Sequence, residues 1–230
     1  MKTRSILLSW IILMTPWMIG SPGAQVESPQ DRPDRALVDV VQQQDFYSAS
    51  ELLKNEQLDV NVPQADGSTA LAWAVHWAHF DTVEGLIRAD ANVNTANDLG
   101  VTPLMLAAHN GSISMAKVLL DAGANPNAAR PSGDTALMLA ARVGNAHLVK
   151  LLTTAGANPN ATTNGGHTAL MWAAAEGHAD VVETLIELGA DFTTPLDSGF
   201  TPFLFAVREG HLDVARVLLS AGAVSYTHLT

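Results

Sequence analysis

Five threonines recur at intervals of 33 residues along most of the chain, and each follows a glycine by two positions. The threonines are Thr69, Thr102, Thr135, Thr168 and Thr201, and the glycines are Gly67, Gly100, Gly133, Gly166 and Gly199. A fixed period of this length indicates one supersecondary unit that stacks on copies of itself. The sequence therefore predicts a solenoid, which offers an extended binding surface more readily than an enclosed catalytic pocket.

Each unit carries the signals of two short helices. In residues 98–129, Thr102 and Pro103 suit a helix start, because threonine caps free amide groups and proline needs no donor at the first helical position. Gly111 is expected to end this helix and Gly123 the next, since glycine adopts the left-handed conformation of a helix end at least cost. We therefore predict an all-α fold of helix-turn-helix units.

These motifs resemble the ankyrin repeat, whose pattern combines Gly-x-Thr-Pro-Leu at the first helix with Gly-Ala-Asp-x-Asn after the second. The resemblance covers roughly residues 35–223 and implies an ankyrin-repeat solenoid with β-turn loop tips. It implies an N-terminal capping repeat at 35–64 and five repeats within 65–224. Their approximate limits are 64–96, 97–129, 130–162, 163–195 and 196–224.

Two departures from the family pattern carry structural expectations. The histidine that follows Thr-Pro-Leu in the family is replaced here by Ala72, Met105, Met138, Met171 and Leu204. We expect apolar packing in its place, with the methionines filling the core rather than binding copper. Ala78 and Asp90 stand where the later repeats have helix-ending glycines. If the left-handed conformation is kept at these positions, alanine should cost about 1 kcal/mol, and aspartate is tolerated better.

The N-terminal residues carry a different signal. Lys2 and Arg4 precede an apolar run from Ile6 to Ile19, and small residues follow as far as Ala24. This order is typical of a secretory signal peptide, and the run is shorter than the roughly 20 residues of a membrane span. We predict a signal peptide at 1–24, a disordered linker at 25–34, and an exported bacterial protein, periplasmic or secreted, with no membrane attachment after signal removal. An uncleaved anchor is the alternative.

The repeat pattern stops after Ala223. Residues 225–230 do not continue it, and we expect a non-native or unstructured tail, with an ordinary short tail as the alternative. The fifth repeat keeps Phe203, Val217 and Leu219 with no polar replacement on its last stacking face. Because such a face would leave a large apolar patch, we expect the natural protein to be longer, with further repeats or another domain.

The composition of the chain and its lack of catalytic motifs argue against an enzyme or a nucleic-acid-binding protein. The net charge of −11 repels phosphate backbones, so nucleic acid is not an expected partner. The chain has no cysteine, which excludes disulfides and zinc–thiolate sites. It also lacks a Gly-rich phosphate loop, a Gly-x-Ser-x-Gly elbow and a His-Glu-x-x-His sequence. We predict a non-enzymatic protein with no catalytic residue, metal, cofactor or small-molecule substrate.

Other conspicuous side chains are expected to be structural. His178 and His211 follow helix-ending glycines, where ankyrin histidines serve local structure. One further repeat position is always large and apolar, and we expect it to lie in the core between the helix layers. It is occupied by Trp73, Leu106, Leu139, Trp172 and Phe205.

In the ankyrin family, the loop tips and the concave side of the first helices contact partner proteins. The resemblance therefore implies a scaffold that binds another protein, of unknown identity, through this face. The implied protein-binding residues are His76, Trp77, Leu99, Val101, His109, Asn110, Asp134, Arg142, Val143, His167, Glu176, Phe200, Arg208 and Glu209. Trp77 has a second interpretation, as a cover for the weakened first repeat. Two other functions stay open: an array that targets or regulates a longer enzyme or surface protein, and a secreted effector.

Overall fold

The computed structural model describes residues 33–223, which form twelve α-helices arranged in six pairs. The first helices of the pairs are α1 (Pro33–Gln42), α3 (Ala70–His76), α5 (Pro103–His109), α7 (Ala136–Val143), α9 (Ala169–Glu176) and α11 (Pro202–Glu209). The second helices are α2 (Phe46–Leu52), α4 (Phe80–Arg88), α6 (Ile113–Asp121), α8 (Ala146–Thr154), α10 (Ala179–Glu187) and α12 (Leu212–Ser220).

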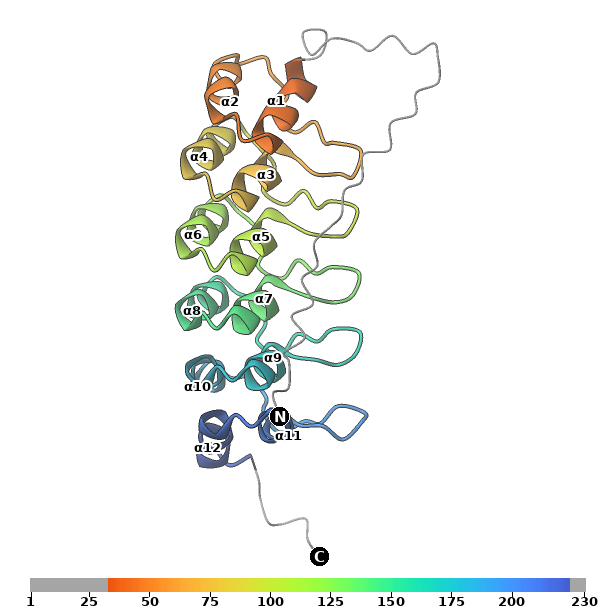
Figure 1. Cartoon of the computed structure of the whole chain (residues 1–230), viewed down its shortest axis with the longest axis vertical. Coiled ribbons are helices and arrows are strands. Elements are labelled where there is room, and N and C mark those ends of the chain that lie inside the picture. The colour runs from red at the N-terminus through yellow and green to blue at the C-terminus, as the bar shows by residue number, and fades with distance from the viewer. Residues whose placement is uncertain (1–32, 224–230) are drawn as a thin grey trace, which may run out of the picture.

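The helices form two layers, because each inner helix packs on the inner helix of the next pair and on the outer helix of its own pair. The inner layer runs from α1 through α3, α5, α7 and α9 to α11, and the outer layer from α2 to α12 (Figure 1). Loops project sideways from the inner layer. Within residues 33–223 the only β pairing is an isolated bridge between Ala129 and Thr135. The predicted all-α repeat solenoid is confirmed.

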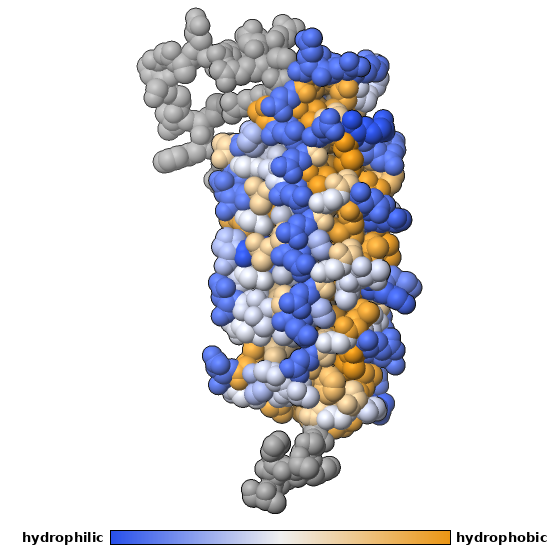
Figure 2. Space-filling view, turned by 180° about the vertical axis from the view of Figure 1, so that it is seen from behind, coloured by the Kyte–Doolittle hydropathy of each residue, from blue (hydrophilic) through white to orange (hydrophobic). Residues whose placement is uncertain are grey.

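The surface repeats along the stack as the sequence does. Figure 2 shows hydrophilic residues in a continuous column down one face, beside a band of hydrophobic residues. Such columns arise because equivalent residues of successive repeats lie one above the other.

The repeated threonines act as helix caps. In all five full repeats, the threonine hydroxyl oxygen accepts a hydrogen bond from the backbone amide three residues later, at 3.3–3.4 Å. This bond satisfies a donor that the first turn of a helix leaves free. The predicted helix starts are therefore confirmed by their capping geometry.

The helix ends also follow the sequence. Ala78 and Asp90 have φ values of 55° and 60°, so both keep the left-handed conformation. Gln44 does the same after α1, with φ of 63°. The capping unit and the first full repeat thus carry non-glycine residues in a conformation that later repeats assign to glycine, which costs stability at this end of the stack.

The core is continuous from the capping unit to the fifth repeat. Met105, Met138 and Met171 are buried within it, which confirms that they fill the core. The equivalent residue of the fifth repeat, Leu204, is 41% exposed, and Val207 is 52% exposed although its counterpart Ala174 is fully buried. The stacking face of α11 and α12 therefore remains open in the described part of the chain.

Several domain predictions concern residues that the structure does not describe. The signal peptide at 1–24 and the tail at 225–230 lie outside the described range. Helix α1 begins at Pro33, so the last two residues of the linker predicted at 25–34 belong to this helix. No helix between residues 33 and 223 is long and apolar enough to cross a membrane.

An asparagine ladder joins successive repeats at the turns that follow the outer helices. The side-chain amides of Asn61, Asn94, Asn127 and Asn160 each donate to a backbone carbonyl of the next unit at 2.8–3.2 Å. The amide oxygens of the same residues accept from the backbone N–H of Asn92, Asn125, Asn158 and Asp191 at 2.6–2.8 Å. The next position holds Thr193, whose hydroxyl instead donates to Asp191 within the same turn.

Thr193→Asn should extend this ladder to the fifth repeat. The new side-chain amide would reach the carbonyl of Gly222, the equivalent of Gly189, which accepts from Asn160. We expect a gain of about 1 kcal/mol in the free energy of unfolding, the typical net value of such a hydrogen bond. Hydrogen exchange should show slower opening of α11 and α12, with Thr162→Asn as a control in an exposed loop position. Unchanged protection of both helices would contradict the ladder's role.

Candidate protein-binding surface

The loop tips are rigid turns. In each full repeat a backbone hydrogen bond of 2.8–3.1 Å closes the tip, as from the amide of Gln64 to the carbonyl of Ser68. The repeated glycine lies inside this turn with φ between 73° and 90°. At Gly133 an added Cβ would come within 2.7 Å of the Thr163 Cα atom of the next tip, so only glycine fits there. The tips are therefore fixed before any partner binds.

We call the exposed side of α3, α5, α7, α9 and α11, together with the five loop tips, the loop-side surface. It carries most of the predicted binding residues, and three of these are large apolar side chains with substantial exposure. Leu99 is 58% exposed at a loop tip, Val143 is 44% exposed at the end of α7, and Trp77 is 39% exposed after α3. Val101 and Phe200 are half-buried.

Trp77 serves the fold as well as the surface. Its indole Nε1 donates to the carbonyl of Gln42 at 3.2 Å, and its ring stacks on Trp73 with centroids 6.4 Å apart. The Trp73 indole in turn donates to Gln64. Trp77 therefore ties the first full repeat to the capping unit while leaving part of its ring exposed, which fits both interpretations of this residue.

Asn110 and Asp134, two further residues of the predicted binding set, use their polar groups in structural contacts. The side-chain amide of Asn110 donates to the carbonyls of Val75 and His76, both at 3.2 Å, and so joins the first two full repeats. The carboxylate of Asp134 accepts from the hydroxyl of Ser132 and orders its own loop tip. Both are less available to a partner than the sequence pattern suggested.

The exposed histidine at the end of α3, His76, favours the neutral state. Burial lowers the pKa of His76, and repulsion from His109 lowers it further. Since a lowered pKa keeps the imidazole uncharged at neutral pH, His76 presents a neutral aromatic ring beside Trp77, with ring centroids 4.7 Å apart.

The predicted residues of the last two repeats come together in one cluster. His167 stacks on Trp172 with ring centroids 5.4 Å apart, and Phe200 lies 5.3 Å from Phe205. His167 also lies 6.0 Å from the Phe205 ring, which links the two pairs. The cluster combines a loop tip, α9 and α11, so residues far apart in the sequence form one aromatic surface.

At the large apolar repeat position, the predicted place in the core is confirmed for Phe205, which is buried, and is wrong for the other four residues. Trp73, Leu106, Leu139 and Trp172 are only half-buried, and Trp172 and Phe205 line an open cleft on the loop side. The reason is geometric. Leu170, Met171 and the paired alanines of α9 fill the directions toward the neighbouring helices, so Trp172 faces the loops. Trp172 is therefore a partly exposed residue of the loop side that the sequence reasoning missed, whereas Phe205 is buried and reaches the cleft from the core.

The cleft beside these rings has a volume of about 640 Å³. Its walls come from α9, α11 and the tip between Leu196 and Phe200. Arg208 lines it, and Arg142 lies at its edge through a contact with the Trp172 ring. Clefts of this size take one or two side chains of a partner or a small ligand.

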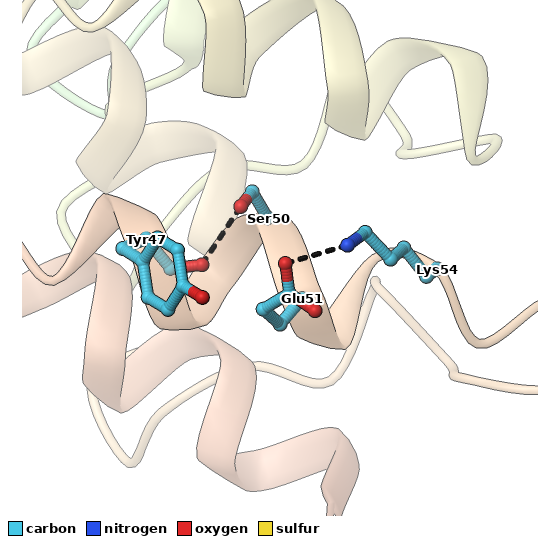
Figure 3. Close-up of polar contacts among 4 residues, drawn as sticks. All are labelled: Tyr47, Ser50, Glu51 and Lys54. Atoms are coloured by element: carbon cyan, nitrogen blue, oxygen red, sulfur yellow. Dashed lines mark hydrogen bonds and ion pairs between the residues drawn. The ribbon is translucent and has the colours of Figure 1, made fainter.

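A larger open cleft, of about 880 Å³, lies on the outer layer between α2 and α4. It forms because α2 has seven residues and α4 has nine, so the last turn of α4 has no helix opposite it. Tyr47, Ser50 and Lys54 line it (Figure 3). Ser50 donates to the carbonyl of Tyr47, and Lys54 pairs with Glu51. Phe46 stacks on His79 in its wall, with ring centroids 3.7 Å apart, but the rim carries charges of both signs. This cleft also lies on the outer layer, away from the loop tips, so we favour the loop-side cleft as the binding site.

The histidines that follow the helix-ending glycines are structural, as predicted. The Nε2 atom of His178 lies 3.1 Å from the carbonyl oxygen of Arg142, and that of His211 lies 3.0 Å from the carbonyl oxygen of Ala175. Each imidazole thus bridges two repeats. Within residues 33–223 no three histidine or acidic side chains gather closely enough to hold a metal ion.

Comparison with known proteins agrees with this architecture. The family model for ankyrin repeats, in three copies, matches residues 37–130 and again residues 137–227. The two matches together span most of the chain, and the protein therefore belongs to the ankyrin repeat family. Ankyrin repeats are in general protein–protein interaction modules. No curated protein matches the chain.

Proposed function

We propose that this protein is a non-catalytic scaffold that holds a partner protein on its loop-side surface. The observation that carries the proposal is the exposure of large apolar side chains on a surface whose backbone is already fixed. Leu99 and Val143 stand out from this surface, and the aromatic cluster of the last two repeats continues it. Exposed anchors on a rigid frame bind with little ordering cost, which is the usual basis of affinity at protein interfaces.

Export is a second part of the proposal. It rests on the charged, apolar and small-residue order of the first 24 residues, which is typical of a secretory signal. The partner would then be a periplasmic or extracellular protein. N-terminal sequencing of the mature protein should give a start near Gln25, and recovery of Met1 from soluble protein in the cytoplasm would contradict export.

The binding surface can be tested with matched apolar substitutions. Leu99→Ser with Val143→Ser removes two exposed anchors from the loop-side surface. Ile113→Ser with Leu212→Ser removes two residues of comparable exposure, 41% and 68%, from the outer helices. We expect the first pair to weaken a captured partner at least tenfold, because anchors of this kind contribute more than 1 kcal/mol each.

The outer pair should leave binding within a factor of about two, and circular dichroism should be the same for both variants, since exposed substitutions change stability little. A larger loss of binding from the outer pair would place the interface on the opposite side and overturn the assignment.

A further inference from the structure

The cleft of the last two repeats has aromatic walls whose faces are already occupied by cations. The guanidinium carbon of Arg142 lies 5.1 Å from the Trp172 ring centroid. That of Arg208 lies 5.2 Å from the Phe200 ring and 5.1 Å from the Phe205 ring. Because guanidinium groups already lie over these ring faces, a cationic ligand would have to displace an arginine to reach them.

Each arginine pairs with a glutamate through only part of its donor set. The Nε atom of Arg142 lies 3.5 Å from Glu176, and the Nε atom of Arg208 lies 2.8 Å from Glu209. Neither arginine's Nη groups form a hydrogen bond or ion pair with another residue in the described part of the chain. A guanidinium with free Nη donors can accept a carboxylate in a charge-assisted geometry.

We propose that this cleft binds a segment of the partner protein in which a large apolar side chain stands next to an Asp or Glu. The inference rests on the proposed function, since it names the partner chemistry for one part of the loop-side surface. The apolar side chain enters the cleft between Ala175, Leu196 and the part of Trp172 that Arg142 leaves open, and the carboxylate pairs with the Nη groups of Arg208 and Arg142. Asp197 also lines the cleft, so a single carboxylate fits better than an acidic run.

The proposed recognition can be measured with short synthetic peptides in an NMR titration of the full chain. The probe is acetyl-Gly-Ser-Leu-Glu-Ser-Gly-amide, and the controls replace its Glu with Gln or its Leu with Ala. We expect the Leu-Glu peptide to shift the indole N–H signal of Trp172 and the amide signals of residues 197–200. Both control peptides should bind at least fivefold more weakly.

Two arginine variants separate recognition from net charge. Arg142→Ala with Arg208→Ala should weaken the Leu-Glu peptide about tenfold, as expected for the loss of charge-assisted hydrogen bonds. Arg88→Ala with Arg216→Ala makes the same change in net charge on outer helices, where both arginines form only exposed pairs, and should leave binding unchanged. Thermal melting of each variant checks that the fold is intact.

Several results would overturn the inference: no binding by the Leu-Glu peptide, equal binding by the Gln peptide, or shifts that map away from α9 and α11. The two proposals can fail separately. If Leu99→Ser with Val143→Ser weakens the captured partner while the Arg142 and Arg208 variant does not, the loop-side scaffold stands and the cleft inference is wrong.

Discussion

Leu137→Ala should lower the free energy of unfolding by about 2–5 kcal/mol, the range found for large-to-small changes in protein cores. Leu137 is almost completely buried in α7, which packs on α5, on α9 and on its own partner α8. The substitution therefore leaves a cavity between three repeats, and the local structure cannot close it without shifting the stack. Chemical denaturation followed by circular dichroism gives the loss directly.

The control is Leu212→Ala on α12, where the side chain is exposed and the expected change is within about 0.5 kcal/mol. Equilibrium unfolding of a repeat array can involve partly folded states. The denaturation curves of the two variants should therefore be fitted with the same unfolding model. A loss below about half a kilocalorie at Leu137 would mean that its position in the stack is wrong.

Gly177→Ala should cost about 2–3 kcal/mol, from two effects that add. Gly177 ends α9 with φ of 85°, a conformation that alanine adopts only at a cost. An added Cβ would also lie 2.6 Å from the Nδ1 atom of His211, so the imidazole must move and lose its contact with the carbonyl of Ala175. The link between the fourth and fifth repeats would weaken as a result.

Gly210→Ala provides the matched comparison. Gly210 has φ of 82°, and an added Cβ meets nothing within 4 Å, so only the backbone cost of about 1 kcal/mol applies. In a His211→Ala background, Gly177→Ala should cost no more than Gly210→Ala. Equal losses for the two glycine variants in the wild-type background would show that the His211 contact contributes nothing.

The sequence predicted those features that depend on neighbouring residues. Thr102 caps α5 through an amide three residues away, and Ala78 is left-handed because the helix must end there. Both are local consequences of the backbone and can be read from one repeat. The burial of Met138 also follows from its place in the repeat, since every internal unit packs in the same way.

The sequence predicted the binding surface less well, because its chemistry depends on contacts between repeats. The pairing of Arg142 with Glu176 and its position over Trp172 join residues at least 30 positions apart. The indole of Trp77 reaches Gln42 across a similar separation. Trp172 was assigned to the core because a large apolar residue recurs at its position, but the orientation of a short helix decides which of its sides faces the loops.

The central claim is that a partner protein lies on the loop-side surface, and hydrogen exchange of the captured complex tests it most directly. Binding should slow exchange at the loop tips, such as residues 97–101 and 196–200, and at the exposed ends of α5, α7 and α11. The outer helices α4, α6, α8 and α10 should exchange as they do in the free protein. Protection confined to those outer helices would contradict the account.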